Sequence, residues 1–215
     1  MTVVYRVRDA AVWSDGDPID LDDAIWTWYH NSGNDDHCVG CDPASTSLWN
    51  AVASIEGSDN DKTITITYED GYANPEWYAL GLISFPAHVA EAQGFDWQND
   101  PEAMAESSEY FMETVPEWSN GPYLVEIWRA DERQELVPNP EWYGEVQPTL
   151  DRLIKIVMSD QSAWVPAIEN NEIHGGAPAS FTPDGYERMD RVQGVQVAVG
   201  SAGAVWEHVD VNLEA

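Results

Sequence analysis

The chain has 215 residues, of which 43% are hydrophobic and eleven are Trp, so it can build a core and is not an intrinsically disordered chain. Its 39 acidic residues face nine Lys and Arg, and the formal net charge of −30 disfavours nucleic acids and anionic lipids as partners. No apolar run approaches the ~18 residues that a membrane-spanning helix needs, and the length corresponds to one large domain or two small ones.

The acidic residues are spread along the chain and do not gather in one tail. We interpret them as the solvated surface of a halophile-type protein. Self-repulsion destabilises such a compact state unless salt screens it, and at ~1 M salt the Debye length falls to ~3 Å. An acidic surface that recruits cations or basic peptides is the alternative.

In chain order, alternating side chains first predict a strand over Thr2–Arg8. Asp20 is placed as the N-cap of a helix with acidic residues in its first turn, where the helix dipole favours negative charge. This helix should end before Asn31. Its expected core-facing residues are Ile25, Trp28 and Tyr29.

A helix is expected over Thr46–Ala53, followed by a hairpin in which Ala53–Glu56 pairs with Lys62–Glu69. Three further helices follow. Asn74 and Pro75 start a short one, Gly94 closes one over Ala87–Gln93, and Pro101–Thr114 forms the third.

The segment 118–150 combines turn and strand signals. A Gly-Pro-Tyr turn at Gly121–Tyr123 precedes the runs Leu124–Arg129 and Glu135–Val137, which predict a hairpin around the charged turn Ala130–Arg133. The loop Asn139–Gly144, rich in Pro and aromatic residues, closes the segment, and we assign its Trp-Tyr pair to packing.

After this segment, the apolar run Arg152–Met158 predicts a strand that is buried on both faces of a mixed or parallel sheet. Helices are expected over Ser162–Asn171 and from Thr182 onward, and strands over Gly194–Val199 and Val205–Val211. This order is α/β in character, and we place a soft boundary near residues 115–117.

Cys38 and Cys41 form a Cys-x-x-Cys pair in a polar loop, and we expect a disulfide between them in an oxidising compartment. A zinc site with His30 and His37 is an alternative, although adjacent His37 and Cys38 can hardly both reach one ion. A redox-active pair would need a helix N-terminus beside a βαβ unit, which is not the context here.

No nucleophile motif or phosphate-binding loop is present, and among 39 acidic residues any catalytic carboxylate pair can be nominated. We therefore expect no enzyme, no catalytic residue, no metal ion and no cofactor. A secreted carbohydrate-active enzyme or a glycan-binding module with an acidic, Trp-rich surface remains the alternative.

The order of several motifs resembles the extracellular solute-binding proteins of family 5, the peptide-, dipeptide- and nickel-binding receptors of ABC importers. The motifs are Arg6-Val7-Arg8 with Trp13-Ser14-Asp15-Gly16-Asp17-Pro18, Gly121-Pro122-Tyr123, Asn139-Pro140-Glu141-Trp142-Tyr143-Gly144, Pro148-Thr149-Leu150-Asp151 and Glu169-Asn170-Asn171-Glu172-Ile173. Three places depart from the family pattern. Ser119-Asn120 stands where Gly-Thr is usual, Asp17 replaces Thr, and His174 replaces Asp.

The resemblance implies a mixed α/β (α+β) fold like that of type II periplasmic binding proteins. Members of that family are much longer, so this chain would hold only the middle of such a receptor. Residues 1–114 would be the family's small extra domain and residues 115–215 part of the first ligand-binding lobe.

By the family layout, the residues expected to approach the ligand-binding cleft are Trp49, Ser84, Phe85, Asn120 and Gly121. Core and turn roles for the same residues are the alternative. The implied partners are a peptide or other small-molecule ligand and an ABC permease in the membrane. The implied location is extracellular, either periplasmic or lipid-anchored, and we expect a monomer.

Overall fold

The structure, a computed structural model, describes residues 1–73, 75–176 and 183–198. The chain divides into two compact units, Met1–Ile156 and Val157–Ala215, and each is described by itself. This division follows compactness alone. The expected boundary between residues 114 and 115 concerns the layout of a longer receptor and stays a prediction.

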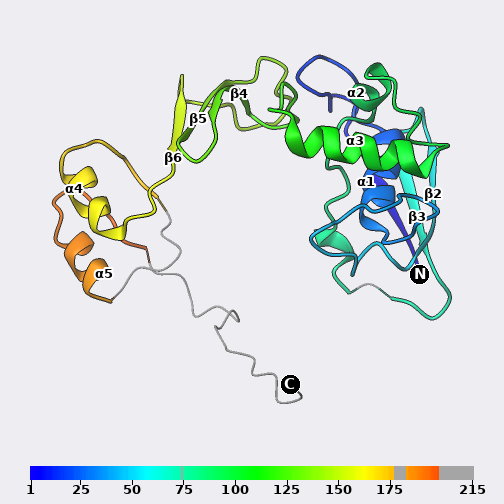
Figure 1. The fold of residues 1–215 in the computed structure, drawn as a ribbon, viewed down its shortest axis with the longest axis horizontal. Coiled ribbons are helices and arrows are strands. Elements are labelled where there is room, and N and C mark those ends of the chain that lie inside the picture. The colour runs from blue at the N-terminus through cyan, green and yellow to red at the C-terminus, as the bar shows by residue number, and fades with distance from the viewer. Residues whose placement is uncertain (74, 177–182, 199–215) are drawn as a thin grey trace. The chain divides into compact units, whose positions relative to one another are not determined.

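The first unit begins with a three-stranded antiparallel sheet (Figure 1). Its strands are β1 (Thr2–Arg6), β2 (Val52–Ser58) and β3 (Thr63–Tyr68), in the order β1-β3-β2. The predicted first strand and the predicted hairpin are therefore confirmed. The turn between β2 and β3 takes positive φ angles at Asp59, Asn60 and Asp61, residue types that tolerate the left-handed region.

The helix predicted over Thr46–Ala53 is wrong. The backbone N–H groups of Trp49 and Asn50 both bond to the Thr46 carbonyl, which makes a single turn. Ala51 then accepts a hydrogen bond from the Glu69 N–H, and β2 begins at Val52. The residues that would have continued the helix therefore pair with the neighbouring strand instead.

Helix α1 (Leu21–Asn31) starts as predicted, because Asp20 and Asp23 form a reciprocal capping box. The helix packs between two cores. On one side Ala24 joins Ile64 and Ile66 of the sheet, and on the other side Trp26 is fully buried against the following helices. The predicted core-facing residues Ile25, Trp28 and Tyr29 are partly buried and pack against these two cores.

The following helices are η1 (Trp77–Ala79), α2 (Ala87–Ala92) and α3 (Pro101–Glu113), near the predicted positions. Figure 1 shows α1, α2 and α3 in one group, and α1 contacts both of the others. The core between them contains Trp26, Trp97, Met104 and Phe111, and the Trp26 indole N–H donates to the buried Ser107 hydroxyl at 3.1 Å.

Cys38 and Cys41 form the predicted disulfide, and Cys38 is buried in this second core. The zinc alternative is not compatible with the closed disulfide, because its thiolates are no longer available. Over the described ranges, no group of three or more His, Cys, Asp or Glu residues could hold a metal ion.

A second antiparallel sheet follows, with strands β4 (Tyr123–Arg129), β5 (Arg133–Pro138) and β6 (Leu153–Ile156) in sequence order. The predicted hairpin is confirmed. The burial predicted for the run Arg152–Met158 is wrong. Its strand, β6, is an antiparallel edge strand, and all four of its residues are exposed. Within the part of the chain that the structure describes, one neighbouring strand pairs with it.

The second unit contains η2 (Gln161–Ala163), α4 (Trp164–Glu169) and α5 (Pro183–Asp190), which match the two predicted helices in position. Residues 194–198 form no strand, in contrast to the prediction, and the strand predicted over Val205–Val211 lies outside the described residues. Among the residues described in both units, no helix has the length and apolar character needed to cross a membrane.

Candidate functional site

A cavity of about 550 Å³ lies in the first unit. This volume is within the usual range for small-molecule sites, about 300–1,000 Å³. Most of the lining is apolar, with one basic, one acidic and one amide side chain. The lining residues are Val7, Arg8, Ala11, Ile19, Ile83, Asn120, Trp142, Tyr143, Gly144, Glu145 and Val146.

One wall is the loop that contains Trp142 and Gly144. The Trp142 indole N–H donates to the Val146 carbonyl at 2.8 Å, which fixes the orientation of the ring. A Cβ atom at Gly144 would lie 2.1 Å from that ring, so the close approach requires glycine. The aromatic pair assigned to packing therefore also lines the cavity, and the glycine after it is the signal in the sequence.

Asn120 lies beside the Gly-Pro-Tyr turn, which partly buried hydrogen bonds hold in place. The Asn139 side chain is 4% exposed and donates to the Gly121 carbonyl at 2.8 Å. The Ser119 hydroxyl accepts from the Gly121 N–H at 3.0 Å and donates to the Tyr123 carbonyl at 2.9 Å. The turn thus has a defined shape, and it holds Asn120 at the cavity.

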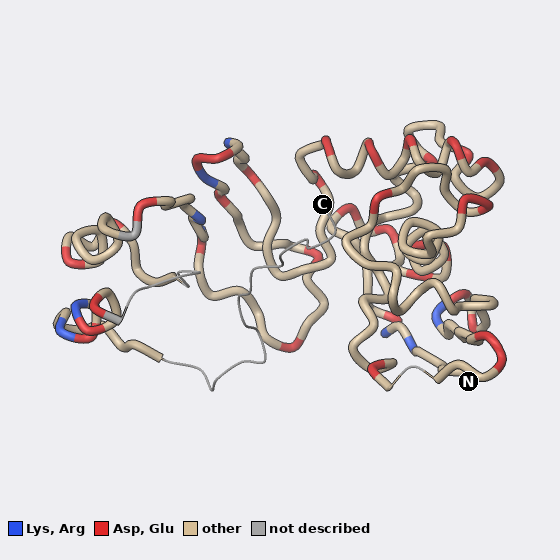
Figure 2. The backbone as a smooth tube through the Cα atoms, turned by 60° about the horizontal axis from the view of Figure 1, so that its bottom comes forward, with Lys and Arg blue, Asp and Glu red and all other residues tan. Residues whose placement is uncertain are grey.

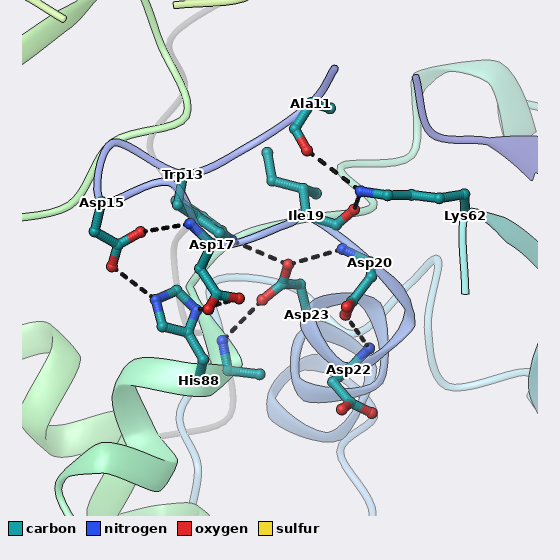
Figure 3. A network of polar contacts seen from close by, with 11 residues as sticks. Ala11, Trp13, Asp15, Asp17, Ile19, Asp20, Asp22, Asp23, Lys62 and His88 are labelled. Carbon is teal, nitrogen blue, oxygen red and sulfur yellow. Dashed lines mark hydrogen bonds and ion pairs between the residues drawn. The ribbon is translucent and has the colours of Figure 1, made fainter. Parts of the chain in front are cut away.

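The opposite wall comes from residues 7–19. Within this segment a tight loop returns on itself, with the Trp13 N–H bonded to the Asp17 carbonyl at 2.8 Å. Gly16 has a φ of +89°, as the turn requires. The Lys62 ammonium group donates to the carbonyls of Ala11 (3.3 Å) and Ile19 (2.6 Å), so a cation closes the base of the loop (Figure 3).

Asp23 supports this wall from beneath (Figure 3). Its Oδ2 accepts from the Trp13 indole N–H at 3.0 Å and from the Asp20 N–H at 3.1 Å, and its Oδ1 accepts from the Ala87 N–H at 2.8 Å. The residue is 2% exposed. Burial raises the pKa of Asp23 to about 6, against the lowering effect of the three hydrogen bonds.

A second polar contact joins the loop to α2. The His88 imidazole lies 2.8 Å from the Asp15 carboxylate and 3.7 Å from that of Asp17 (Figure 3). Partial burial raises the pKa of Asp15, but the hydrogen bond to His88 and backbone N–H donors outweigh it and hold the pKa below its ordinary value. His88 therefore favours the ionised form of Asp15.

The residues predicted to approach the cleft lie in different surroundings. Asn120 lines the cavity and Gly121 is its neighbour in the turn. Trp49 is 6% exposed in the first core, and Phe85 stacks on Phe111 in the second core. Ser84 is exposed beside Ile83 of the cavity lining. Ligand contact by all five residues stays a prediction.

The second unit has a cavity of its own, about 330 Å³ in volume. Trp164 lies across Gly176, where an added Cβ would meet the indole ring at 2.3 Å. His174, which departs from the family motif, is in the lining. The described lining residues are Trp164, Ile168, His174, Gly175, Gly176, Tyr186, Met189, Val195, Gln196, Val197 and Ala198.

The fold is similar to solved structures of substrate-binding proteins. A periplasmic EDTA-binding protein, EppA, matches with a TM-score of 0.72 and 35% identity over 88% of this chain and 33% of that chain. The oligopeptide-binding protein AppA from Bacillus subtilis, solved with a nonapeptide, matches with a TM-score of 0.63 and 18% identity over 80% of this chain and 31% of that chain. The fold is thus part of a type II periplasmic-binding-protein fold, as the sequence implied.

The sequence comparison makes the assignment specific. The family described as bacterial extracellular solute-binding proteins, family 5 Middle, matches residues 1–214, and the chain belongs to this family. The oligopeptide-binding protein OppA of Mycobacterium tuberculosis (strain ATCC 25618 / H37Rv) is 30% identical over 214 residues, 98% of this chain and 32% of that protein. The dipeptide-binding protein DppE of Bacillus subtilis (strain 168) is 21% identical over 222 residues, 99% of this chain and 38% of that protein. The chain therefore spans about a third of the length of such relatives.

Proposed function

We propose that the chain is the middle part of the substrate-binding subunit of an ABC importer. The subunit captures peptides or similar small solutes and delivers them to a membrane permease. The match to family 5 over residues 1–214 carries this proposal. Relatives named for oligopeptide and dipeptide binding support peptides as the ligand class.

Within this proposal, residues 1–114 form the family's extra domain and residues 115–215 belong to the first ligand-binding lobe. The cavity at Asn120 supports a binding role, because its apolar walls carry few, separated polar groups, Arg8 and Glu145 among them. Trp49, Ser84, Phe85 and Gly121 remain proposed ligand contacts. Hinge closure of two lobes over the ligand is the proposed mechanism.

An extracellular location, with anchoring by lipid or in the periplasm, belongs to the same proposal. The disulfide supports it, because such bonds persist in oxidising compartments. One relative is named a lipoprotein. Figure 2 shows acidic residues along all parts of the described chain, which supports a solvated surface adapted to salt. We also propose that the subunit acts as a monomer.

The family is one of binding proteins, which agrees with the expectation that the chain is not an enzyme. The comparisons give no support to the alternative of a secreted carbohydrate-active enzyme or glycan-binding module.

A thermal-shift screen of the complete natural protein against a peptide mixture, a sugar mixture and nickel tests the proposal. A ligand that binds only the folded state stabilises it by RT ln(1 + [L]/Kd), or ~2.7 kcal/mol at ~100 times Kd. We expect peptides to raise Tm and sugars to leave it unchanged. Stabilisation by sugars alone, together with sugar release, would refute the proposal. The 215-residue chain by itself should bind peptides weakly or not at all, because most of the receptor is absent from it.

A further inference from the structure

We propose that Asp23 is a positioning residue. Its carboxylate couples the start of α2 and the loop at residues 13–17 to the Gly-Pro-Tyr turn, and thereby sets Asn120 at the cavity. The functional consequence rests on the ligand-binding role proposed for that cavity. The coupling itself follows from contacts among the described residues, which Figure 3 shows in part.

Three separate segments of the chain meet at the Asp23 side chain. Asp23 belongs to α1, and it accepts from Trp13 in the loop, from Asp20 before the helix and from Ala87 at the start of α2. Ala87 and Trp13 are separated from Asp23 by 64 and 10 residues. All three partners are donors, so both oxygens of Asp23 must act as acceptors.

A hydrogen bond joins this loop to the Gly-Pro-Tyr turn. The Ser14 hydroxyl, next to Trp13, accepts a hydrogen bond from the Ser119 N–H at 3.0 Å. These two residues are 105 positions apart. The Ser119 hydroxyl in turn holds Gly121, and Asn120 lies between them on the cavity. A displacement of Trp13 therefore moves the acceptor on which Ser119 depends.

The isosteric amide cannot replace the Asp23 carboxyl group. An amide keeps one acceptor oxygen and directs an NH2 group at donors on its other side. Leaving buried donors without acceptors is costly. Asp23→Asn should therefore loosen the loop or the start of α2 without creating a cavity.

The coupling should respond to pH, because Asp23 is titratable and other charged groups lie around it. Asp20 faces it from the N-cap position of α1, and His88 of α2 lies between Asp15 and Asp17 of the loop. The Lys62 ammonium group bonds to carbonyls at the base of the loop. Burial raises the pKa of Asp23, so the packed state binds a proton more tightly than a loosened state, and the coupling tightens as pH falls through about 6.

The test is residue-resolved amide hydrogen exchange on the 215-residue chain, expressed as protection factors. Asp23→Asn should lower the protection of both Ser119 and Ala87 by about tenfold or more. Asp22→Asn removes the same charge from an exposed neighbouring position and should leave both amides unchanged. Ser14→Ala should affect Ser119 and spare Ala87.

The pH profile gives a second readout of Asp23, and the comparison of Ser14→Ala with Asp23→Asn separates positioning from a simple loss of stability. In the unmodified chain, protection of Ser119 and Ala87 should rise as pH falls from 7 to 5, and Asp23→Asn should remove most of that rise. If Asp23→Asn does not fold, the profile of the unmodified chain and the Ser14→Ala variant decide the question. Equal protection of Ser119 in Asp23→Asn and Asp22→Asn, or no pH response at Ala87 in the unmodified chain, would overturn the coupling.

The functional arm uses the complete protein with a synthetic peptide mixture as the probe. Ser14→Ala should weaken binding severalfold while Asp22→Asn does not. If the complete protein binds no peptide, the proposed function fails, and the exchange results still decide whether Asp23 positions the turn. If Ser14→Ala loses protection at Ser119 but binds peptide normally, the coupling to ligand binding is refuted.

Discussion

Asp23 leads to a quantitative prediction for global stability. The residue is 2% exposed, and burial raises its pKa from 3.8 to about 6. In the unfolded chain the carboxyl group ionises near its ordinary pKa. The folded state therefore binds the proton more tightly, and Asp23 reduces the free energy of unfolding as pH rises from about 4 to about 6. At ~1.4 kcal/mol per pKa unit, the total change is about 3 kcal/mol.

The perturbation is Asp23→Asn, which has no charge to titrate. We expect the free energy of unfolding of the variant, minus that of the unmodified chain, to become more positive by up to ~3 kcal/mol between pH 4 and pH 7. Urea denaturation at several pH values in constant salt measures this difference. Lost hydrogen bonds shift the difference at every pH, so its change with pH is the quantity to compare.

The other carboxylates titrate in the same range, but they are common to both proteins and cancel in the difference. Glu106→Gln on the exposed side of α3 removes the same charge from a solvated position and serves as the control. Its difference should change little between pH 4 and pH 7. A flat difference for Asp23→Asn as well would refute the assignment of the burial cost to this carboxylate.

Three further predictions concern the loop, the disulfide and the charge. Gly144→Ala places a Cβ 2.1 Å from the adjacent indole ring, so calorimetry should show a lower Tm and the fluorescence of that Trp should change. Replacement of both Cys38 and Cys41 by Ser opens a four-residue loop and should cost about 2 kcal/mol in urea denaturation. Raising NaCl from 0.1 M to 1 M should raise Tm, because the Debye length falls from ~10 Å to ~3 Å and screens the net charge of −30.

The elements that the sequence predicted correctly have strong local signals. Asp20 caps α1 through side-chain contacts within four residues, and Pro101 starts α3 at a position where its missing N–H is harmless. The turn at residues 59–61 uses Asn and Asp at positive φ, and it sets the register of the first hairpin. These features depend on neighbours in sequence, so a single chain reveals them.

The incorrect predictions depend on tertiary contacts. Periodicity correctly placed Ile25, Trp28 and Tyr29 against the core, but it did not show that α1 packs between two cores or that Trp26 is the residue that is fully buried. The apolar run at β6 predicted burial, yet Ile154 and Ile156 are 47% and 50% exposed on an edge strand. Hydrophobicity indicates what a segment can bury, and the elements around it decide whether it is buried.

In the candidate site, too, local features could be predicted and tertiary contacts could not. Asn120 was predicted because the turn beside it resembles a family motif, whereas the cavity itself was not predicted. Ile19 and Trp142 face it from positions far apart in the sequence. Asp23 could be recognised as a first-turn acid of a helix, but its contact with Ala87 needs the packing of α2 on α1.

Several of the few basic residues stabilise polar contacts inside this highly acidic chain. Lys62 donates to two loop carbonyls beneath the cavity wall. Arg133 and Arg152 both contact Glu135, which is 6% exposed in the second sheet. A buried carboxylate without a partner would be strongly destabilising, and the two guanidinium groups compensate it. The remaining negative charge is mostly on the surface, where salt can screen it, and the structure at the candidate site depends on specific contacts and not on net charge.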